Sequence, residues 1–261
     1  MRFDDRVVVV TGGALGIGRA VGDVLAERGA SVAILDWDES AGSEACSQIE
    51  GKGGRAIFQR VDVSNRQDVQ SSVEKAYSAF GRIDSLVVSA GIQRYGTALT
   101  TDDAQWDEVI NVNLRGAWNA ARSTLPFIRQ AGGGTIVNVS SVQALASQQN
   151  VLAYTVSKHG LLGLTRSMAM DFAKENIRVN AVCPGTVDTP MLKWAASLDS
   201  DPQSVYDACN AMHPLGRIAQ PREIAEVVAF LAHESSSFVT GAVWTVDGGL
   251  LTQIGGVPRT S

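Results

Sequence analysis

The tyrosine and the lysine of the segment Tyr154-Thr155-Val156-Ser157-Lys158 lie four residues apart. In a helix this spacing places Tyr154 and Lys158 one turn apart on the same face. A tyrosine ordinarily titrates near ~10, so its phenol is a poor base at neutral pH, whereas a neighbouring ammonium favours the phenolate and lowers the pKa. The pair therefore predicts an acid/base group at Tyr154, although the same spacing also occurs on solvated helix faces.

A glycine-rich segment at residues 11–18, TGGALGIG, follows the first apolar run of the chain and leads into an amphipathic stretch. Glycines allow a tight turn and a close approach to a pyrophosphate, and free N–H groups at a helix N-terminus favour an anion. Between a strand and a helix, this pattern predicts a dinucleotide site.

Asp36 ends the second apolar run, about twenty residues past the glycines, where a carboxylate can accept hydrogen bonds from adenosine ribose hydroxyls and repel a 2′-phosphate. We therefore expect NAD rather than NADP as the cofactor. The alternative for Asp36 is an ordinary acid in a turn, and Arg19 could in principle meet a phosphate.

Short apolar runs of strand length alternate with stretches in which apolar residues recur three and four apart. Strands are expected at 7–10, 32–35, 57–61, 86–88, 136–139, 179–182 and 242–246, and helices at 16–27, 69–80, 105–121, 152–172 and 223–231. This alternation predicts one α/β domain over residues 1–261, with a doubly wound parallel sheet (a Rossmann fold) in three α/β/α layers. Residues 185–214 are the least regular stretch, and we expect a substrate lid there.

The bulk properties exclude several classes of partner. The net charge is only −5, with Lys and Arg scattered, so we expect neither nucleic acid nor a membrane as a partner. Three cysteines and three histidines form no metal-ligand spacing, so no metal is expected. The start, MRFDDRVVVV, does not have the pattern of a secretory signal, and we expect a reduced, cytoplasmic protein.

Together with the Ser140-Ser141 pair after a strand, these motifs resemble the short-chain dehydrogenase/reductase family along nearly the whole chain. The resemblance implies a catalytic set of Asn113, Ser141, Tyr154 and Lys158. Ser141 would orient the substrate oxygen, Tyr154 would exchange the hydroxyl proton, and Lys158 would hold the nicotinamide ribose. Asn113 would position a water that links Lys158 to solvent, while Ser140 is expected to make a hydrogen bond at the strand end.

The resemblance also implies cofactor-binding residues. They are Gly12, Leu15, Gly16, Ile17, Gly18, Asp36, Asp62, Val63, Ser89, Ala90, Gly91, Tyr154, Lys158, Pro184, Gly185, Thr186, Val187 and Thr189. Asp62 is expected at the adenine amino group, and the residues from Pro184 onward at the nicotinamide carboxamide. The family usually carries Asn-Asn-Ala-Gly after the fourth strand, whereas this chain has Val88-Ser89-Ala90-Gly91, so we expect local rearrangement of the sheet or ribose contacts there.

The residues expected around the substrate are mostly polar. They are Gln93, Arg94, Ser141, Gln143, Gln148 and Met191. Buried amides and a guanidinium are costly without partners, which predicts a small polyhydroxylated substrate such as a sugar, polyol or sugar acid. Arg94 could grip a carboxylate in a bidentate manner, or else be a solvated loop arginine.

Two other functions stay open: an NADPH-dependent reductase of carbonyls or 3-oxoacyl thioesters, and a non-catalytic NAD-binding sensor. The apolar helices at 105–121 and 152–172, and the assembly typical of the family, predict a homotetramer. The tail at 250–261 is expected to reach a neighbouring subunit.

Overall fold

The computed structural model describes residues 1–253, so most of the predicted tail, residues 254–261, lies outside the described part of the chain. Within it, seven parallel strands form one sheet in the order β3-β2-β1-β4-β5-β6-β7. The strands are β1 (Val7–Thr11), β2 (Ser31–Asp36), β3 (Arg55–Arg60), β4 (Ser85–Val88), β5 (Gly134–Val139), β6 (Ile177–Pro184) and β7 (Val243–Val246).

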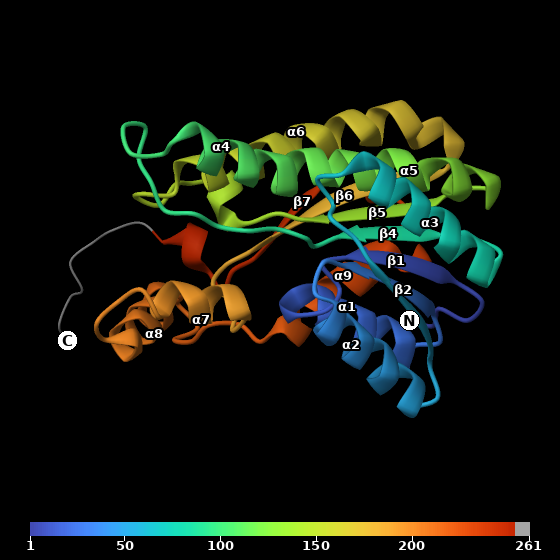
Figure 1. The fold of residues 1–261 in the computed structure, drawn as a ribbon, viewed down its shortest axis with the longest axis horizontal. Coiled ribbons are helices and arrows are strands. Elements are labelled where there is room, and N and C mark those ends of the chain that lie inside the picture. The colour runs from blue at the N-terminus through green and yellow to red at the C-terminus, as the bar shows by residue number, and fades with distance from the viewer. Residues whose placement is uncertain (254–261) are drawn as a thin grey trace.

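Helices cover both faces of the sheet (Figure 1). One layer contains α1 (Gly16–Glu27), α2 (Glu39–Gly51) and α9 (Pro221–Ala232), and the other contains α3 (Arg66–Phe80), α4 (Asp103–Ile110), α5 (Gly116–Gln130) and α6 (Leu152–Phe172). Two further helices, α7 (Pro190–Ala196) and α8 (Pro202–Met212), lie together at one end of the molecule. The prediction of a doubly wound sheet in three layers is confirmed.

The strand β1 shows why the central strands are continuous apolar runs. All five of its residues are buried, and their side chains alternate between the two helical layers. Val8 and Val10 belong to the core beneath α1 and α9, whereas Val7 and Val9 belong to the core beneath α3, α5 and α6. Both faces of the sheet are therefore dry at its central strand β1.

The strand order reverses next to β1, which pairs with β2 on one side and with β4 on the other. At such a switch point the connections leave in opposite directions, and a crevice opens beyond the carboxyl ends of the strands. The glycine-rich loop follows β1 and the Ser89-Ala90-Gly91 turn follows β4, so the fold brings two of the predicted cofactor segments to this crevice.

Residues 185–214 are not irregular, contrary to the expectation, because most of them form α7 and α8. Both helices begin with a proline at the first turn, where its missing N–H costs nothing. Asp201 also caps α8 by accepting hydrogen bonds from Gln203 N and Ser204 N. These local signals start helices that are too short and too exposed to show an apolar period.

The predicted helix at 105–121 is part of a longer one. A π-helical turn at Asn111–Arg115 joins α4 to α5, and α5 continues to Gln130. The sequence also gave no indication of α2, which buries only Gly42, Ala45 and Ile49 and is capped by Asp38.

Asp84, just before β4, ties that strand to the start of β1. Its carboxylate is 2% exposed and accepts hydrogen bonds from Val7 N at 2.9 Å, Arg6 at 2.8 Å and Arg82 at 2.6 Å. Burial opposes ionisation, but the hydrogen bonds from Arg82, Val7 and Arg6 outweigh it and hold the pKa of Asp84 below its usual value.

We expect Asp84→Asn to lower the free energy of unfolding by about 2 kcal/mol at neutral pH, because charge-assisted hydrogen bonds of a buried carboxylate are lost. A depressed native pKa contributes stability above the unfolded pKa and loses it as pH falls through the native value. The difference from wild type should therefore shrink in acid, below about pH 4. Urea denaturation between neutral pH and pH 3 measures it, with exposed Asp4→Asn as the control. A difference independent of pH would contradict this account.

Candidate active site

The glycine loop is shaped for close contact and leaves amides free. A Cβ on Gly12, whose φ is +66°, would lie 2.6 Å from Ala90 Cα, and a Cβ on Gly18 would lie 2.1 Å from Gly12 O. The first hydrogen bond of α1 runs from Arg19 N to Leu15 O, so the three preceding amides have no partner within the helix. Backbone donors at a helix N-terminus that no side chain obstructs suit a pyrophosphate.

Asp36 lies at the end of β2 against this loop. It is buried, and its carboxylate oxygens accept hydrogen bonds from Ala14 N at 3.0 Å and Asp38 N at 3.1 Å. The structure thus brings Asp36 and the glycine loop together. Asp62 is exposed and accepts hydrogen bonds from the backbone and hydroxyl of Ser64.

Val63 is buried next to Asp62, and its carbonyl accepts a hydrogen bond from Asn119 Nδ2 at 3.0 Å. A Cβ on Gly116 would lie 2.8 Å from the Val63 side chain, so α5 packs closely on this segment. Val63 is therefore held in place from the helical layer.

The turn after β4 is held by Thr11, which the sequence analysis did not single out. The buried Thr11 hydroxyl lies 3.3 Å from Ser89 N and 3.5 Å from Ala90 N, and Ser89 N also donates to Thr11 O at 3.1 Å. A Cβ on Gly91 would lie 3.5 Å from Lys158 Nζ. This turn therefore links the glycine loop to the predicted catalytic residues.

Asn113 lies in the π-helical turn and is buried. Its Oδ1 accepts from Ile92 N at 2.8 Å, and its Nδ2 donates to Ile92 O at 2.9 Å and to Ser157 Oγ at 3.0 Å. The extra residue of a π turn re-aims a side chain and is frequent at functional sites. Here it directs Asn113 at the backbone that follows Gly91. Ser157, also missed from sequence, bonds in turn to Tyr154 O at 2.7 Å.

Tyr154 and Lys158 are both buried, on the inward face of α6. Lys158 Nζ donates a hydrogen bond to Val139 O at 3.0 Å and lies 5.5 Å from the centroid of the Tyr154 ring. Ser141 caps the short turn after β5 by accepting from Gln143 N and also contacts the Tyr154 phenol. The four predicted catalytic side chains thus come together. Ser140 Oγ donates to Lys158 O at 3.1 Å, which confirms its expected backbone role.

The expected lowering of the Tyr154 pKa is wrong for the chain alone. Burial raises the pKa of Tyr154 to about 12, against a smaller lowering by the Ser141 hydrogen bond. Burial also lowers the pKa of Lys158 to about 8, so the ammonium that was expected to stabilise the phenolate is itself disfavoured. At neutral pH the phenol is protonated and can donate its proton to a carbonyl oxygen.

The segment from Pro184 to Thr189 closes the site from the β6 side. A Cβ on Gly16 would lie 3.3 Å from the methyl group of Thr189, which precedes α7, so the start of α7 contacts the glycine loop. Ala219 pairs with this segment by donating to Thr186 O and accepting from Asp188 N, both at 2.9 Å. The predicted pyrophosphate and carboxamide segments therefore share one crevice.

The polar residues predicted around the substrate mostly pair with one another. Arg94 forms an ion pair with Glu108 at 2.7 Å and donates to Gln93 O, while the Gln93 side chain bonds to Tyr95. Gln143 donates to Gln148 at 2.9 Å. These pairings satisfy the side chains without a ligand, and Arg94 already has a carboxylate partner in Glu108.

The remaining lining is apolar and aromatic. Met191 of α7, Ile92 and Trp106 pack against a buried cluster of Val109, Val151, Ala153 and Tyr154. Tyr95 and Trp194 stack with their ring centroids 5.8 Å apart, which joins the loop after β4 to α7. The surroundings of Tyr154 are therefore less polar than predicted.

The fold, with Ser141, Tyr154 and Lys158 brought together near a glycine loop, is that of a dinucleotide-dependent oxidoreductase. A family model described as "Enoyl-(Acyl carrier protein) reductase" matches residues 12–251. The chain is 42% identical to cis-4-hydroxycyclohexanecarboxylate dehydrogenase of Sinomonas cyclohexanicum, over 95% of this chain and 97% of the relative. It is 38% identical to the 3-oxoacyl-(acyl-carrier-protein) reductase FabG of Thermotoga maritima, over 96% of this chain and 100% of the relative.

Among solved structures, ligand-free aldohexose dehydrogenase of Thermoplasma acidophilum matches with a TM-score of 0.91 and 36% identity, over 98% of both chains. The chain belongs to the short-chain dehydrogenase/reductase family. It is an oxidoreductase of CH–OH groups whose fold binds a nicotinamide dinucleotide. In residues 1–253, no helix has the length and hydropathy needed to span a bilayer, and no group of His, Cys, Asp or Glu is arranged to hold a metal.

Lys158→Met tests the desolvation of the site. With a native pKa of about 8 against 10.5 for the free side chain, native Lys158 loses its proton at lower pH than the unfolded chain does. The unfolded state then binds more protons, so the free energy of unfolding rises with pH across this window. Relative to Lys158→Met, wild type should therefore gain stability from about pH 8 to about pH 10.

Urea denaturation at several pH values resolves this gain, because each pKa unit corresponds to about 1.4 kcal/mol. The exposed Lys193→Met serves as the control and should show no such trend. A constant difference between wild type and Lys158→Met would mean that the ammonium is not desolvated.

Proposed function

We propose that the protein is an NAD-dependent dehydrogenase of a secondary alcohol carried on a small ring. The observation that supports this most directly is the arrangement of Ser141, Tyr154 and Lys158 near a glycine loop whose Ala14 amide donates to the buried Asp36 at the end of β2. The residues fit a dinucleotide because the glycine loop packs too tightly for a side chain at Gly12 or Gly18, and the first amides of α1 have no partner within residues 1–253.

The preference for NAD rests on charge. The two recorded hydrogen bonds to Asp36 use one lone pair on each carboxylate oxygen, so acceptor capacity remains for the ribose hydroxyls. Its negative charge opposes a 2′-phosphate. Arg19, the cation inside α1 that could have met a phosphate, is engaged by Asp23 at 3.0 Å and Gln48 at 2.6 Å.

In this proposal, NAD supplies the hydride acceptor when it is bound. Ser141 orients the substrate oxygen through its hydroxyl, and Tyr154 exchanges the alcohol proton at Oη. A positive charge brought near the phenol would offset the burial that raises its pKa. Lys158 uses one N–H on Val139 O, which leaves donors for a ribose, and Asn113 fixes the Ile92 backbone beside it.

The proposed substrate class follows from how few of the polar side chains around the site are without a partner. Arg94, Gln93, Gln143 and Gln148 are already engaged, and Met191 and Trp106 present apolar surface near Tyr154. A compact ring with one reacting hydroxyl fits such a lining better than a polyol does. The relative from Sinomonas cyclohexanicum is named for an alicyclic hydroxy acid, which supports this choice.

A sugar, polyol or sugar acid, the substrate expected from sequence, stays the second candidate, because the aldohexose dehydrogenase shares 36% of aligned residues. The NADPH-linked 3-oxoacyl reductase is supported by the relative from Thermotoga maritima, but Asp36 argues against it.

We also propose a cytoplasmic homotetramer, for which the 48% exposed Trp118 on α5 and the 80% exposed Met170 on α6 offer apolar contact surface.

A substrate panel tests the function. Formation of NADH from NAD, or of NADPH from NADP, is followed with cyclohexanol, 4-hydroxycyclohexanecarboxylate, an aldohexose and a linear polyol. In the reverse direction, a 3-oxoacyl thioester is assayed with NADPH and with NADH. We expect NAD-dependent turnover of a ring alcohol at least about tenfold above the polyol in kcat/KM. Turnover of the thioester with NADPH alone would overturn both the cofactor and the substrate assignment.

Tyr154→Phe tests the acid/base role. Removing the phenolic hydroxyl should lower kcat by about 10²-fold or more while the Kd for NAD changes little, since proton transfer typically contributes that much. Stopped-flow turnover and calorimetric NAD binding measure the two effects. Tyr77→Phe, which removes a hydroxyl on α3 that accepts a hydrogen bond from Gln130 at 2.8 Å, is the matched control. Near-normal turnover by Tyr154→Phe would contradict the mechanism and revive the sensor hypothesis.

A further inference from the structure

His213, directly after α8, is 3% exposed and uses both ring nitrogens. Nδ1 lies 2.7 Å from Cys209 O, and Nε2 lies 3.1 Å from Thr186 N. A carbonyl oxygen can only accept and a backbone N–H can only donate, so Nδ1 carries the proton and Nε2 is the acceptor. The contacts thus define one neutral tautomer of a buried imidazole.

The imidazole is pressed against the segment after β6. A Cβ on Gly185 would lie 2.6 Å from His213 Nε2, so only glycine lets the ring reach the Thr186 amide. On the other side, a Cβ on Gly248 would lie 3.5 Å from His213 Cβ. The His213 side chain therefore packs against Gly185, which follows β6, and against Gly248, which lies just beyond β7.

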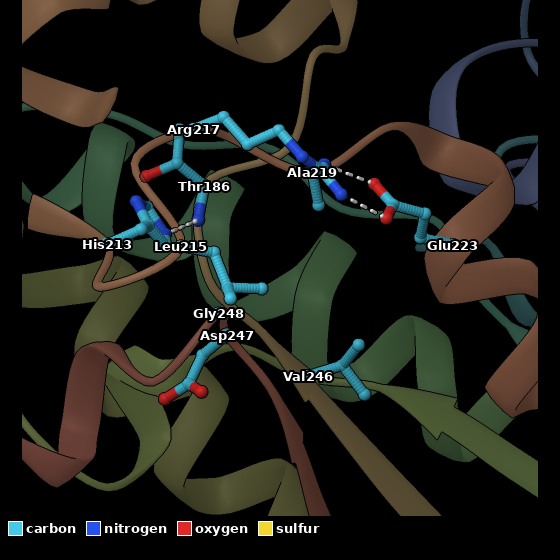
Figure 2. Close-up of a pocket in the computed structure, with 9 residues that line it drawn as sticks. All are labelled: Thr186, His213, Leu215, Arg217, Ala219, Glu223, Val246, Asp247 and Gly248. Carbon is cyan, nitrogen blue, oxygen red and sulfur yellow. Dashed lines mark hydrogen bonds and ion pairs between the residues drawn. The ribbon is translucent and has the colours of Figure 1, made fainter. Parts of the chain in front are cut away.

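Figure 2 shows this bond at a cavity of about 90 Å³. The Arg217 guanidinium lies along the same cavity and pairs with Glu223 of α9 through both of its oxygens, at 2.7 and 2.8 Å. Arg217 precedes Ala219, which donates to Thr186 O. Thr186 is thus held from two sides, by Ala219 at its carbonyl and by His213 at its amide.

We propose that His213 is a positioning residue for the nicotinamide end of the cofactor, acting through the Thr186 amide. The proposal rests on the proposed NAD site, in which Pro184 to Thr189 hold the carboxamide. His213 ties α8 to this segment through the chain Cys209 O, imidazole, Thr186 N. Placement of α8 and placement of the carboxamide segment then depend on each other.

Two substitutions separate the two hydrogen bonds. In His213→Asn, the amide nitrogen replaces Nδ1 and keeps the bond to Cys209 O, but Thr186 N loses its acceptor. In His213→Gln, the amide oxygen reaches the position of Nε2 and accepts from Thr186 N. The readouts are kcat/KM for the alcohol, and calorimetric Kd values for NAD and for ADP-ribose, which lacks the nicotinamide.

We expect His213→Asn to lower kcat/KM about tenfold and to weaken NAD binding, the effect of one buried donor left unpaired. His213→Gln should stay within about threefold of wild type. Both variants should bind ADP-ribose like wild type, because the adenosine end lies on the far side of the glycine loop at Asp36. Equal losses in the two variants, or equal weakening of NAD and ADP-ribose binding, would overturn the proposal.

The wild-type protein is titrated first with NAD and NADP, which tests the cofactor assignment separately. If NADP binds more tightly, the variants are compared with NADP and 2′-phospho-ADP-ribose, and the same outcomes decide the role of His213.

Discussion

The close approach of Gly12 to the turn after β4 is the contact on which the active site depends. A side chain at Gly12 would displace Ala90, and displacement of Ala90 would break the bonds of Thr11 to that turn. Gly91, one residue on, lies against Asn113 and Lys158. A short path of contacts therefore connects the glycine loop with Lys158, and it exists because β1 and β4 are neighbours at the point where strand order reverses.

Burial of Tyr154 and Lys158 determines the pKa values of both side chains. Lys158 and Tyr154 lie where water cannot solvate their charged forms, so the lysine tends toward the amine and the tyrosine toward the phenol. The protein thus holds a protonated phenol next to a lysine whose charge burial disfavours, in a dry site in which any added charge has a large effect. The proposed acid/base role of Tyr154 therefore needs a bound cofactor to favour the phenolate, because the chain alone favours the protonated phenol.

The sheet and its layers could be predicted because both faces of β1, β4 and β5 are buried, which leaves unbroken apolar runs in the sequence. The set of Asn113, Ser141, Tyr154 and Lys158 was implied by the family resemblance, and the structure brings these four side chains together. What sequence could not provide depends on tertiary contacts: the π turn that aims Asn113, the capped helices α7 and α8, and the burial that reverses the expected shift of the Tyr154 pKa.

The same limit applies to the residues predicted around the substrate. From residue type alone, Arg94, Gln93, Gln143 and Gln148 were predicted to form a polar pocket. The sequence does not show which partner a polar side chain has in the folded chain. The ion pair of Arg94 with Glu108 joins residues fourteen positions apart, and it gives a carboxylate partner to the guanidinium that was expected to select an acid. For the proposed ring alcohol, recognition would depend on shape, through Met191, Trp106 and the Tyr95–Trp194 stack, and on hydrogen bonds from Ser141 and Tyr154 to the one reacting hydroxyl. Since apolar pockets discriminate weakly between rings that differ by one methylene, the proposed site would accept several related ring alcohols and would fix mainly the position of the reacting carbon.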